Sequence, residues 1–387
     1  MYPTISDLLK DLLGIHIPLP IQTFGFFVAL AFVAANYFIT RELKRKEREG
    51  LLQPTLKTVV EGLPASANEL LMNGLYGFII GYKILYIILN YQEFAANPQH
   101  VVISLEGSFL GGLLAAAGMA YWTYAEKKKH QLAKPVTKQV PLHPYQLMGN
   151  ITIIAAVAGI IGAKIFHNLE NLDEFALDPW GSLFSFSGLT FYGGLICGTA
   201  AVLWYTNKFR IPVVHLFDSA APGLMLAYGV GRIGCQMSGD GDWGIVNTSP
   251  KPGWLDFLPD WFWSYNYPNN VLGEGIPIPG CEGTHCNALA FPVFPTPLYE
   301  AIACILLFVL LWSFRKRITV PGLMFSVYLV LNGFERFFIE KIRVNTLYHA
   351  FGKAFTQAEL ISSAMILIGI AGIYWSLKQR KSGRPTV

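Results

Sequence analysis

An arginine followed by a glycine-rich turn is the part of the chain whose residue types most clearly suggest chemistry. Residues 229–244 read GVGRIGCQMSGDGDWG, so an apolar segment leads into Arg232 and then into a turn with two aspartates. An ionisable residue at the edge of an apolar span is costly and is therefore a candidate for function. Glycines let backbone N–H groups approach a ligand without a Cβ in the way. A fixed guanidinium beside such donors predicts a site for a phosphate group, such as that of a phospholipid.

A second group of charged residues lies in the segment NGFERFFIEKIRVN, residues 332–345. If the segment is helical, one stripe of its surface carries Asn332, Arg336, Glu340 and Arg343. Arg336 lies deepest, where insertion of a charge costs about 2.5–3.5 kcal/mol, so we expect it to serve function, with Glu340 orienting it. For Glu340 and Arg343, an ion-pair network that only holds helices together is an equally good interpretation.

The composition indicates a membrane protein. Of 387 residues, 53% are hydrophobic and 14% charged, and the mean hydropathy is +0.40, which excludes a disordered chain and argues against a soluble domain. Apolar segments near the roughly 20 residues that a spanning helix needs recur at 21–39, 70–90, 107–124, 147–167, 189–206, 213–231, 296–314, 321–339 and 357–376. We expect an all-α integral membrane protein with about nine transmembrane helices. The first segment lacks the features of a cleaved signal peptide, so we expect it to be retained.

Lysine and arginine placement predicts the orientation of the chain. Basic segments follow the first, third, fifth, seventh and ninth spans, and they read RELKRKER, KKKHQLAK, KFR, RKR and KQRKSGR. The loops at 91–106 and 168–187 contain neither residue type. The N-terminus is therefore expected outside and the C-terminus in the cytoplasm. The net charge of +4 then reflects loops near anionic lipid and gives no reason to expect nucleic-acid binding.

These spans suggest seven successive regions. They are an amphipathic outer-surface segment (1–20), a first span with its basic loop (21–68), a hairpin with its basic loop (69–146), a second hairpin and sixth span (147–231), a long outer loop (232–295), three last spans (296–376) and a cytoplasmic tail (377–387). In the first region the leucines at 8, 9, 12 and 13 share one face of a short helix, which suits a segment lying on the membrane surface.

The two hairpins look like copies of each other. The segment GYKILYIILNYQEF at 81–94 resembles GAKIFHNLENLDEF at 162–175, and Gly111, Gly112 and Trp122 recur at nearly the same spacing as Gly193, Gly194 and Trp204. Two hairpins in the same orientation are typical of a parallel repeat. We interpret this as a duplicated helical hairpin whose first copy is a scaffold or a lateral gate.

The long outer loop is rich in tryptophan and contains two neighbouring cysteines. Its tryptophans at 243, 254, 261 and 263 are typical of the membrane–water interface. Cys281 and Cys286 lie in CEGTHC, and an oxidising exterior favours a disulfide between them. Zinc would need more ligands than this segment with His285 offers. We therefore expect a disulfide, no metal and no cofactor.

Several stretches, taken in order, resemble the phosphatidylglycerol–prolipoprotein diacylglyceryl transferase family. They are GRIGCQMSGDGDWG at 231–244, SGLTFYGGLICG at 187–198, PTPLYEA at 295–301 and ERFFIEKIR at 335–343, together with DSAAPG from Asp218 and FTQAELIS from residue 355. The similarity extends from about residue 150 to 375. The order of the motifs is specific, whereas any one alone would be weak.

The resemblance implies transfer of a diacylglyceryl group from phosphatidylglycerol to the lipobox cysteine thiol of a prolipoprotein, with release of glycerol phosphate. Such a displacement needs an activated thiol and stabilised charge on the departing phosphate. The implied partners are phosphatidylglycerol and the signal-peptide region that carries the lipobox. The implied location is the bacterial cytoplasmic (inner) membrane.

The resemblance also implies roles for individual residues. Arg232 and Arg336 would hold the phosphate, Glu340 would orient Arg336, and Asp218 would steady Arg232. Further substrate-binding candidates are Gly239, Asp240, Asp242 and Gly244 of the turn, with Gly193, Gly194, Arg343, Lys164 and Tyr299. For Lys164, simple snorkelling of its amine to the interface is an equally plausible interpretation.

The chain departs from the family pattern at four positions. Tyr192 stands where the family usually has histidine, and the other departures are Cys235 for asparagine, Phe294 for histidine and Asn332 for tyrosine. A tyrosine with a pKa near 10 is a poor base at neutral pH. The general base is therefore open: Tyr192 could position substrate while His167 or His349 takes the proton, although such histidines are more often plain interfacial residues.

Two other functions remain open on the sequence. A transporter or channel could carry repeats and intramembrane charges, but it would be expected to place charges near the midplane in both repeat copies. Here Arg232, Arg336 and Arg343 all follow the second copy. A phospholipid-binding paralogue without turnover is the other alternative, because of Tyr192.

Overall fold

The structure is a computed structural model, and it describes residues 1–387 except 16–19, 185–187, 189, 346–347, 351–352 and 383–387. Within these residues nine helices have 18 residues or more. They are α2 (Thr23–Arg48), α3 (Ala67–Leu89), α6 (Phe109–Lys129), α7 (Met148–Glu170), α10 (Phe191–Lys208), α11 (Val213–Ser238), α12 (Thr296–Phe314), α13 (Leu323–Glu340) and α14 (Gln357–Ser382). Each of the nine expected apolar segments corresponds to one of them.

Six of the described helices are long and apolar enough to cross a membrane. They are α2, α3, α7 with the preceding turn, α11, α12 and α14. The mostly helical fold and these six helices agree with the expected class of membrane protein. The expected count of nine spans, which would add α6, α10 and α13, stays a prediction.

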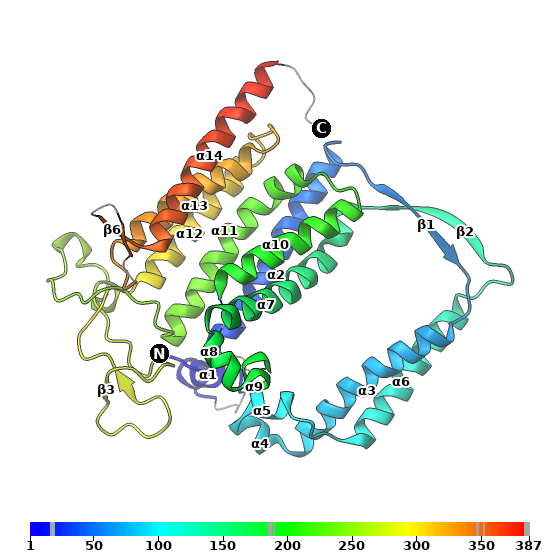
Figure 1. The fold of residues 1–387 in the computed structure, drawn as a ribbon, viewed down its shortest axis with the longest axis horizontal. Helices are drawn as coiled ribbons and strands as arrows, with labels where there is room; N and C mark the ends of the chain where they lie inside the picture. The colour runs from blue at the N-terminus through cyan, green and yellow to red at the C-terminus, as the bar shows by residue number, and fades with distance from the viewer. Residues whose placement is uncertain (16–19, 185–187, 189, 346–347, 351–352, 383–387) are drawn as a thin grey trace.

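Seven of the long helices pack side by side in the order α14, α13, α12, α11, α2, α7 and α10 (Figure 1). Helix α11 contacts α2 on one side and α12 and α13 on the other. Small residues allow this: Gly223 lies against Ala35 and Ile39, and Gly234 lies against Phe27. Close approach at small residues is how helices associate in a membrane, where lipid removes the hydrophobic driving force. The later residue of α11 contacts the earlier part of α2, so the two helices run antiparallel.

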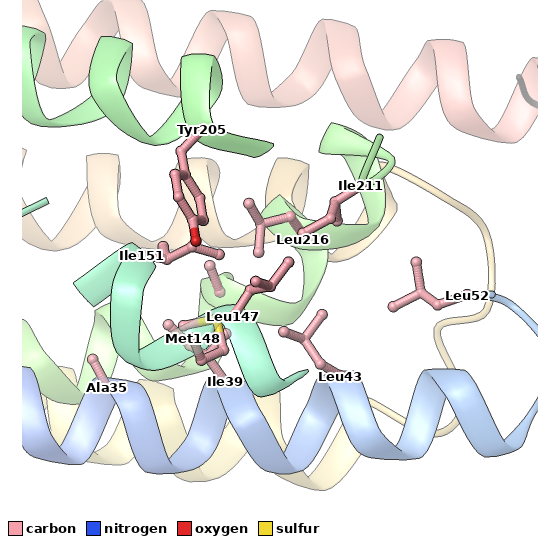
Figure 2. Close-up of a cluster of buried hydrophobic side chains, with 11 residues drawn as sticks. Ala35, Ile39, Leu43, Leu52, Leu147, Met148, Ile151, Tyr205, Ile211 and Leu216 are labelled. Atoms are coloured by element: carbon pink, nitrogen blue, oxygen red, sulfur yellow. The ribbon is translucent and has the colours of Figure 1, made fainter. Parts of the chain in front are cut away.

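Two clusters of buried side chains hold this row together. Figure 2 shows the first, in which Tyr205 of α10 points toward Ile151 of α7, while Ile39 and Leu43 of α2 lie beneath Leu147. The second cluster joins α11, α12 and α13 through Ala221, Met225, Cys304, Phe308, Leu311 and Met324. Together they fix α11 at the centre of the bundle.

The two hairpins that resemble each other in sequence also use equivalent contacts. A Cβ on Gly81 would lie 2.4 Å from the carbonyl oxygen of Gly111, and a Cβ on Gly162 would lie 2.4 Å from that of Gly193. At the turn of each hairpin, the N–H of Ser108 donates to the oxygen of Tyr82 at 2.8 Å, and the N–H of Thr190 donates to that of Ala163 at 3.1 Å. The α3–α6 and α7–α10 pairs therefore cross at corresponding glycines.

The fold differs from the all-α expectation by three small antiparallel pairs of strands. The longest joins β1 (Thr55–Glu61) to β2 (Val136–Leu142), which carry the α3–α6 hairpin away from the bundle (Figure 1). The others are β3 (Ile276–Pro277) with β4 (Asn287–Ala288) and β5 (Tyr348–Ala350) with β6 (Lys353–Phe355). The first pair was not foreseen because its strands are separated in sequence by the whole hairpin.

Short helices lie at one end of the bundle and at the tip of the α3–α6 hairpin (Figure 1). They are α1 (Ile5–Leu13), α4 (Tyr91–Ala96), α5 (Pro98–Ile103), α8 (Leu172–Leu177) and α9 (Pro179–Phe184). The predicted amphipathic segment forms α1, whose Leu12 and Leu13 are exposed. The N-terminal amine donates to the oxygen of Pro268, and the N–H of Tyr2 donates to that of Met237. The N-terminus and the loop after α11 thus share one end.

The basic segments gather at the opposite end. Arg45 donates to the backbone oxygen of Arg315, and Lys46 donates to that of His215 at the start of α11. The hydroxyl of Ser376, near the end of α14, contacts the oxygen of Pro321. The ends of α2, α12 and α14 therefore meet where α11 begins.

The glycine crossing generates a stability prediction. Replacing Gly162 with alanine should lower the free energy of unfolding by about 1–3 kcal/mol, because the added methyl group meets the rigid backbone of Gly193. Gly118→Ala in α6 is the control, since nothing lies within 4 Å of its Cβ position. Thermal unfolding in detergent should show a lower Tm for G162A only. Equal Tm values would mean that the crossing does not limit stability.

Candidate active site

Glu300, the fifth residue of α12, lies at the centre of a buried cluster of charges. Its side chain is fully buried, and three guanidiniums approach it. The Nε of Arg232 lies 2.6 Å from Oε2, while the Nη1 atoms of Arg336 and Arg343 lie 2.8 and 3.6 Å from Oε1. These arginines come from α11, from α13 and from the segment after α13. One carboxylate therefore joins three separate parts of the chain.

Two further carboxylates complete the cluster. Asp242 forms ion pairs with both Arg232 and Arg343, and Glu340 lies 3.3 Å from the Nη2 of Arg336. Asn345 donates to Glu340 at 2.6 Å. Three arginines thus face three acidic side chains, which compensates much of the cost of burying each charge.

Arg232 and Arg343 reach this cluster in ways that the sequence pattern did not predict. Helix α11 continues to Ser238 and ends at Gly239, so Arg232 lies within the helix and not at its end. Helix α13 ends at Glu340, so the expected helical stripe does not include Arg343. An isolated bridge between Gly244 and Arg343 positions Arg343 instead.

Glycines of the glycine-rich turn pack closely against neighbouring segments. A Cβ on Gly244 would lie 2.4 Å from the oxygen of Ile342 and 2.9 Å from atoms of Phe294. The N–H of Gly244 donates to Phe294 at 2.9 Å, and the N–H of Gly239 donates to Cys235 at 3.0 Å. Both donors are therefore occupied, so the expectation of free N–H groups is wrong at these two glycines, whereas the role of the turn in shaping the ligand pocket stays a prediction. Gly239, at φ 64°, also allows the left-handed turn that ends α11.

Two of the arginines keep donors for a ligand. In the described part of the chain, neither Nη2 of Arg232 nor Nε of Arg336 donates a hydrogen bond. Their side chains are 15% and 22% exposed, whereas that of Arg343 is 8% exposed. Arg232 and Arg336 can thus bind an anion while their other nitrogens stay fixed on Glu300.

Tyr192, at the start of α10, faces the same cluster. Its hydroxyl group lies within the electrostatic reach of Arg336 and Glu340, and the side chain is half-buried. Four helices therefore contribute to one site, namely α10, α11, α12 and α13. In the motif that precedes Tyr192, residues 187 and 189 lie outside the described residues.

The comparisons with known proteins agree with this arrangement. The sequence profile of the prolipoprotein diacylglyceryl transferase family matches residues 11–144 and 130–375. The chain belongs to this family. The resemblance inferred from the motifs is confirmed, and membership in a family of transferases does not favour the transporter alternative.

Several curated relatives carry the name phosphatidylglycerol–prolipoprotein diacylglyceryl transferase. The protein of Leptospira interrogans is 24% identical over 391 residues, which cover 93% of this chain and 91% of that protein. Those of Dehalococcoides mccartyi and Corynebacterium glutamicum are each 27% identical, and the matches cover 61% and 62% of this chain and 79% and 72% of those proteins. Because the match to the first relative covers nearly all of this chain, it extends over the α3–α6 hairpin.

Some residues with an expected binding role lie elsewhere. Asp218 accepts from the N–H groups of Gly322 and Phe325 and pairs with Lys46 at 3.9 Å. The prediction that Asp218 steadies Arg232 is therefore wrong, because the two residues lie at opposite ends of α11. Asp218 instead holds the start of α13.

The paired glycines and Lys164 belong to the α7–α10 crossing. Gly193 packs against Gly162, and a Cβ on Gly194 would lie 3.1 Å from the oxygen of Gly159. Both glycines are thus needed for helix contact, which differs from the expected contact with substrate. Lys164 is buried in α7 beside Gly162. Its expected contact with the lipid phosphate stays a prediction.

The remaining family positions have structural partners. The hydroxyl of Tyr299 donates to the oxygen of Phe262 at 2.7 Å, so Tyr299 anchors the loop after α11. Phe294 packs edge-on against Trp263, and Asn332 faces the sulfur of Met225. Cys281 and Cys286 form the predicted disulfide.

The two candidate histidines lie outside the arginine cluster. His167, in the last turn of α7, contacts the side chain of Asn171, and His349 is exposed on β5. Neither has a contact that identifies it as the base. The expectation that one of these histidines takes the proton therefore stays a prediction.

Cys235, Asp240 and Asp242 form the group in this region that could hold a cation. Their potential ligand atoms lie within 4.8 Å of one another. Burial raises the pKa of Asp240, and the charge of Asp242 raises it further. Burial also acts to raise the pKa of Asp242, but Arg232 and Arg343 lower it below its usual value. A metal would compete with these guanidiniums, and the expectation of a metal-free site stays a prediction.

Sequence reasoning missed two acidic residues. Glu300 stands in the quoted motif PTPLYEA, and an acidic residue near the start of an apolar span was a signal of a functional candidate. Glu335 precedes Arg336, and both of its carboxylate oxygens are buried without a hydrogen bond to the described residues. Only the packing of α12 against α13 reveals that these two side chains are buried near each other.

The cluster generates a second stability prediction. Glu300→Gln should lower the free energy of unfolding by about 3–5 kcal/mol, because it leaves buried guanidiniums without their shared carboxylate. The control is Glu61→Gln, which removes an exposed ion pair with Lys138. It should change the free energy of unfolding by less than about 1 kcal/mol. Thermal unfolding of both variants in detergent tests this. A similar Tm for the two would show that Glu300 does not organise the cluster.

Proposed function

We propose that this chain transfers the diacylglyceryl group of phosphatidylglycerol to the lipobox cysteine of prolipoproteins, the first step of lipoprotein maturation. One observation carries the proposal: Arg232 and Arg336 share the buried carboxylate of Glu300 and still present free donors. Planar guanidiniums fixed in this way suit a phosphodiester better than the flexible amine of lysine does. Membership in the family supports the substrate assignment.

In the proposed reaction the two arginines bind the phosphate of the lipid. The cysteine sulfur attacks the glycerol carbon that bears the phosphate ester, so a carbon–sulfur bond forms and a carbon–oxygen bond breaks. The electron pair of the broken bond moves to the phosphate oxygen, and glycerol phosphate leaves with one additional negative charge. Arg232 and Arg336 stabilise that charge as it develops. Glu300 and Glu340 hold the guanidinium groups of these arginines in a fixed orientation.

The thiol must also lose its proton. Tyr192 interacts electrostatically with Arg336 and Glu340, which supports a role for its hydroxyl group in positioning a substrate by a hydrogen bond. We assign Tyr192 this positioning role and propose that His167 or His349 accepts the proton of the thiol. A cysteine thiol near pKa 8.5 needs only a weak base to supply thiolate.

We further propose that all nine long helices span the bacterial cytoplasmic membrane, with the N-terminus outside. The gathering of basic segments at one end of the bundle supports this orientation. The arginine cluster then faces the outer leaflet, where a lipobox would arrive. The exposed side chains of Trp254 and Phe257 in the adjacent loop suit contact with the membrane surface or with the incoming signal peptide.

A labelling assay tests the reaction. Membranes containing this protein should attach diacylglycerol from labelled phosphatidylglycerol to a lipobox peptide. Arg232→Ala and Arg336→Ala should each lower the rate by about 10²–10³-fold, because each removes a donor to the developing charge. Arg317→Ala, at the far end of α12, is the control and should keep the wild-type rate. Full activity in both cluster variants would refute the proposed roles.

The positioning role of Tyr192 has a separate test. Tyr192→Phe removes only the hydroxyl group, so it should lower kcat markedly while membrane insertion and Tm stay unchanged. The rate of peptide labelling at saturating phosphatidylglycerol measures this. The matched control is Tyr205→Phe, which lies in the apolar cluster at the other end of α10. If both variants keep full activity, the hydroxyl group of Tyr192 does not position a substrate, and the side chain serves packing alone.

A further inference from the structure

A pocket of about 770 Å³ lies at the end of the bundle opposite to the arginine cluster. It is formed by residues 33–48 in the second half of α2, by Trp312 in the last turn of α12 and by Arg315 and Lys316 after it. Because α2 runs antiparallel to α11, this end is the one where α11 begins. A volume of this size suits a small ligand or a lipid head group.

Six cationic side chains line this pocket. They are Arg41, Lys44, Arg45, Arg48, Arg315 and Lys316, and the one acidic side chain among the lining residues is Glu42. Glu42 is buried and pairs with Arg45 and, at 3.4 Å, with Arg315. Its charge is therefore already balanced, which leaves the pocket strongly positive.

The buried pairing also gives the pocket a fixed wall. Arg45 contacts Glu42 through its Nε at 3.1 Å and the backbone oxygen of Arg315 through Nη2 at 3.4 Å. These contacts tie the end of α2 to the end of α12. A basic segment that only sets membrane orientation would need no such arrangement.

Four of the cations are not neutralised. Within the described part of the chain, no ion pair to a carboxylate involves Arg41, Lys44, Arg48 or Lys316. All four side chains are exposed. Arg41, Lys44 and Arg48 follow one face of α2, so their charges point toward a common region.

An aromatic and then an apolar surface continues this face into the bundle. Arg315 lies 3.7 Å over the ring of Trp312, and Arg41 lies 5.0 Å over that of Tyr37. Beyond Tyr37 on the same face of α2 come Val33 and Leu30, which are 65% and 42% exposed. The order of cations, aromatic rings and aliphatic side chains matches the order of head group, interface and acyl chain in a lipid leaflet.

We propose that this pocket binds the phosphate of an anionic phospholipid, whose acyl chains lie along Val33 and Leu30. The ligand chemistry is a phosphate ester, and the adjoining apolar face selects a lipid over free phosphate. The site is separate from the proposed catalytic centre, and the argument for it does not depend on the transferase reaction. It is a lipid site in the other leaflet.

Lipid retention measured by native mass spectrometry tests the proposal. The full-length protein is loaded with phosphatidylserine in phosphatidylcholine nanodiscs and released into detergent. The variant K44Q/R48Q/K316Q should bind phosphatidylserine at least about tenfold more weakly than the wild type, since each cation near a membrane surface contributes about fivefold. The control K127Q/K128Q/K129Q removes three cations from the end of α6, outside the pocket, and should retain the lipid.

Two further arms sharpen the result. The variant K44R/K316R should retain phosphatidylserine, which separates lost charge from lost folding. Inorganic phosphate is added at about 10 mM, which exceeds a dissociation constant of about 1 mM for weak binding. The bound lipid should stay in place. Displacement of the lipid would overturn the lipid assignment in favour of free phosphate. Equal lipid loss in the two triple variants, or none in either, would overturn the proposed pocket.

Discussion

A carboxylate buried at the end of an apolar bundle needs compensating charge, and the site depends on how Glu300 obtains it. Water cannot reach this side chain, so the cost of desolvation falls on the protein. Arg232, Arg336 and Arg343 supply the charge from three separate segments. The ion pairs that join these segments therefore also fix the direction of the two arginines that stay partly exposed. Folding and the proposed phosphate recognition rest on the same contacts.

The two ends of the bundle use arginine in different ways. Around Glu300 the guanidiniums are matched by acidic side chains, so the site can bind a lipid phosphate without a large excess of positive charge. Around Glu42 only two cations are matched, and four are left exposed. The first arrangement suits recognition with defined geometry, and the second suits attraction of anionic lipid.

The sequence predicts the helices and much of the site, because hydropathy and charge depend on local pattern. Arg232, Arg336 and Glu340 were expected together and lie together. The partners of Arg343 were not predictable, since they depend on how Gly244 packs between distant segments. The error for Asp218 was avoidable: it lies 14 residues before Arg232 on one helix, roughly 21 Å away at 1.5 Å per residue.

The β1–β2 pair bears on how far the α3–α6 hairpin depends on the rest of the fold. Thr55 pairs with Leu142, so the two ends of the segment between them lie side by side, and Thr55 also contacts Phe209 of the bundle. The intervening helices α3 and α6 make their main packing with each other. Such a segment can be gained or excised in a single genetic event without moving its surroundings, as with a domain inserted into a host fold. Evolution could thus modify this appendage without disturbing the catalytic apparatus.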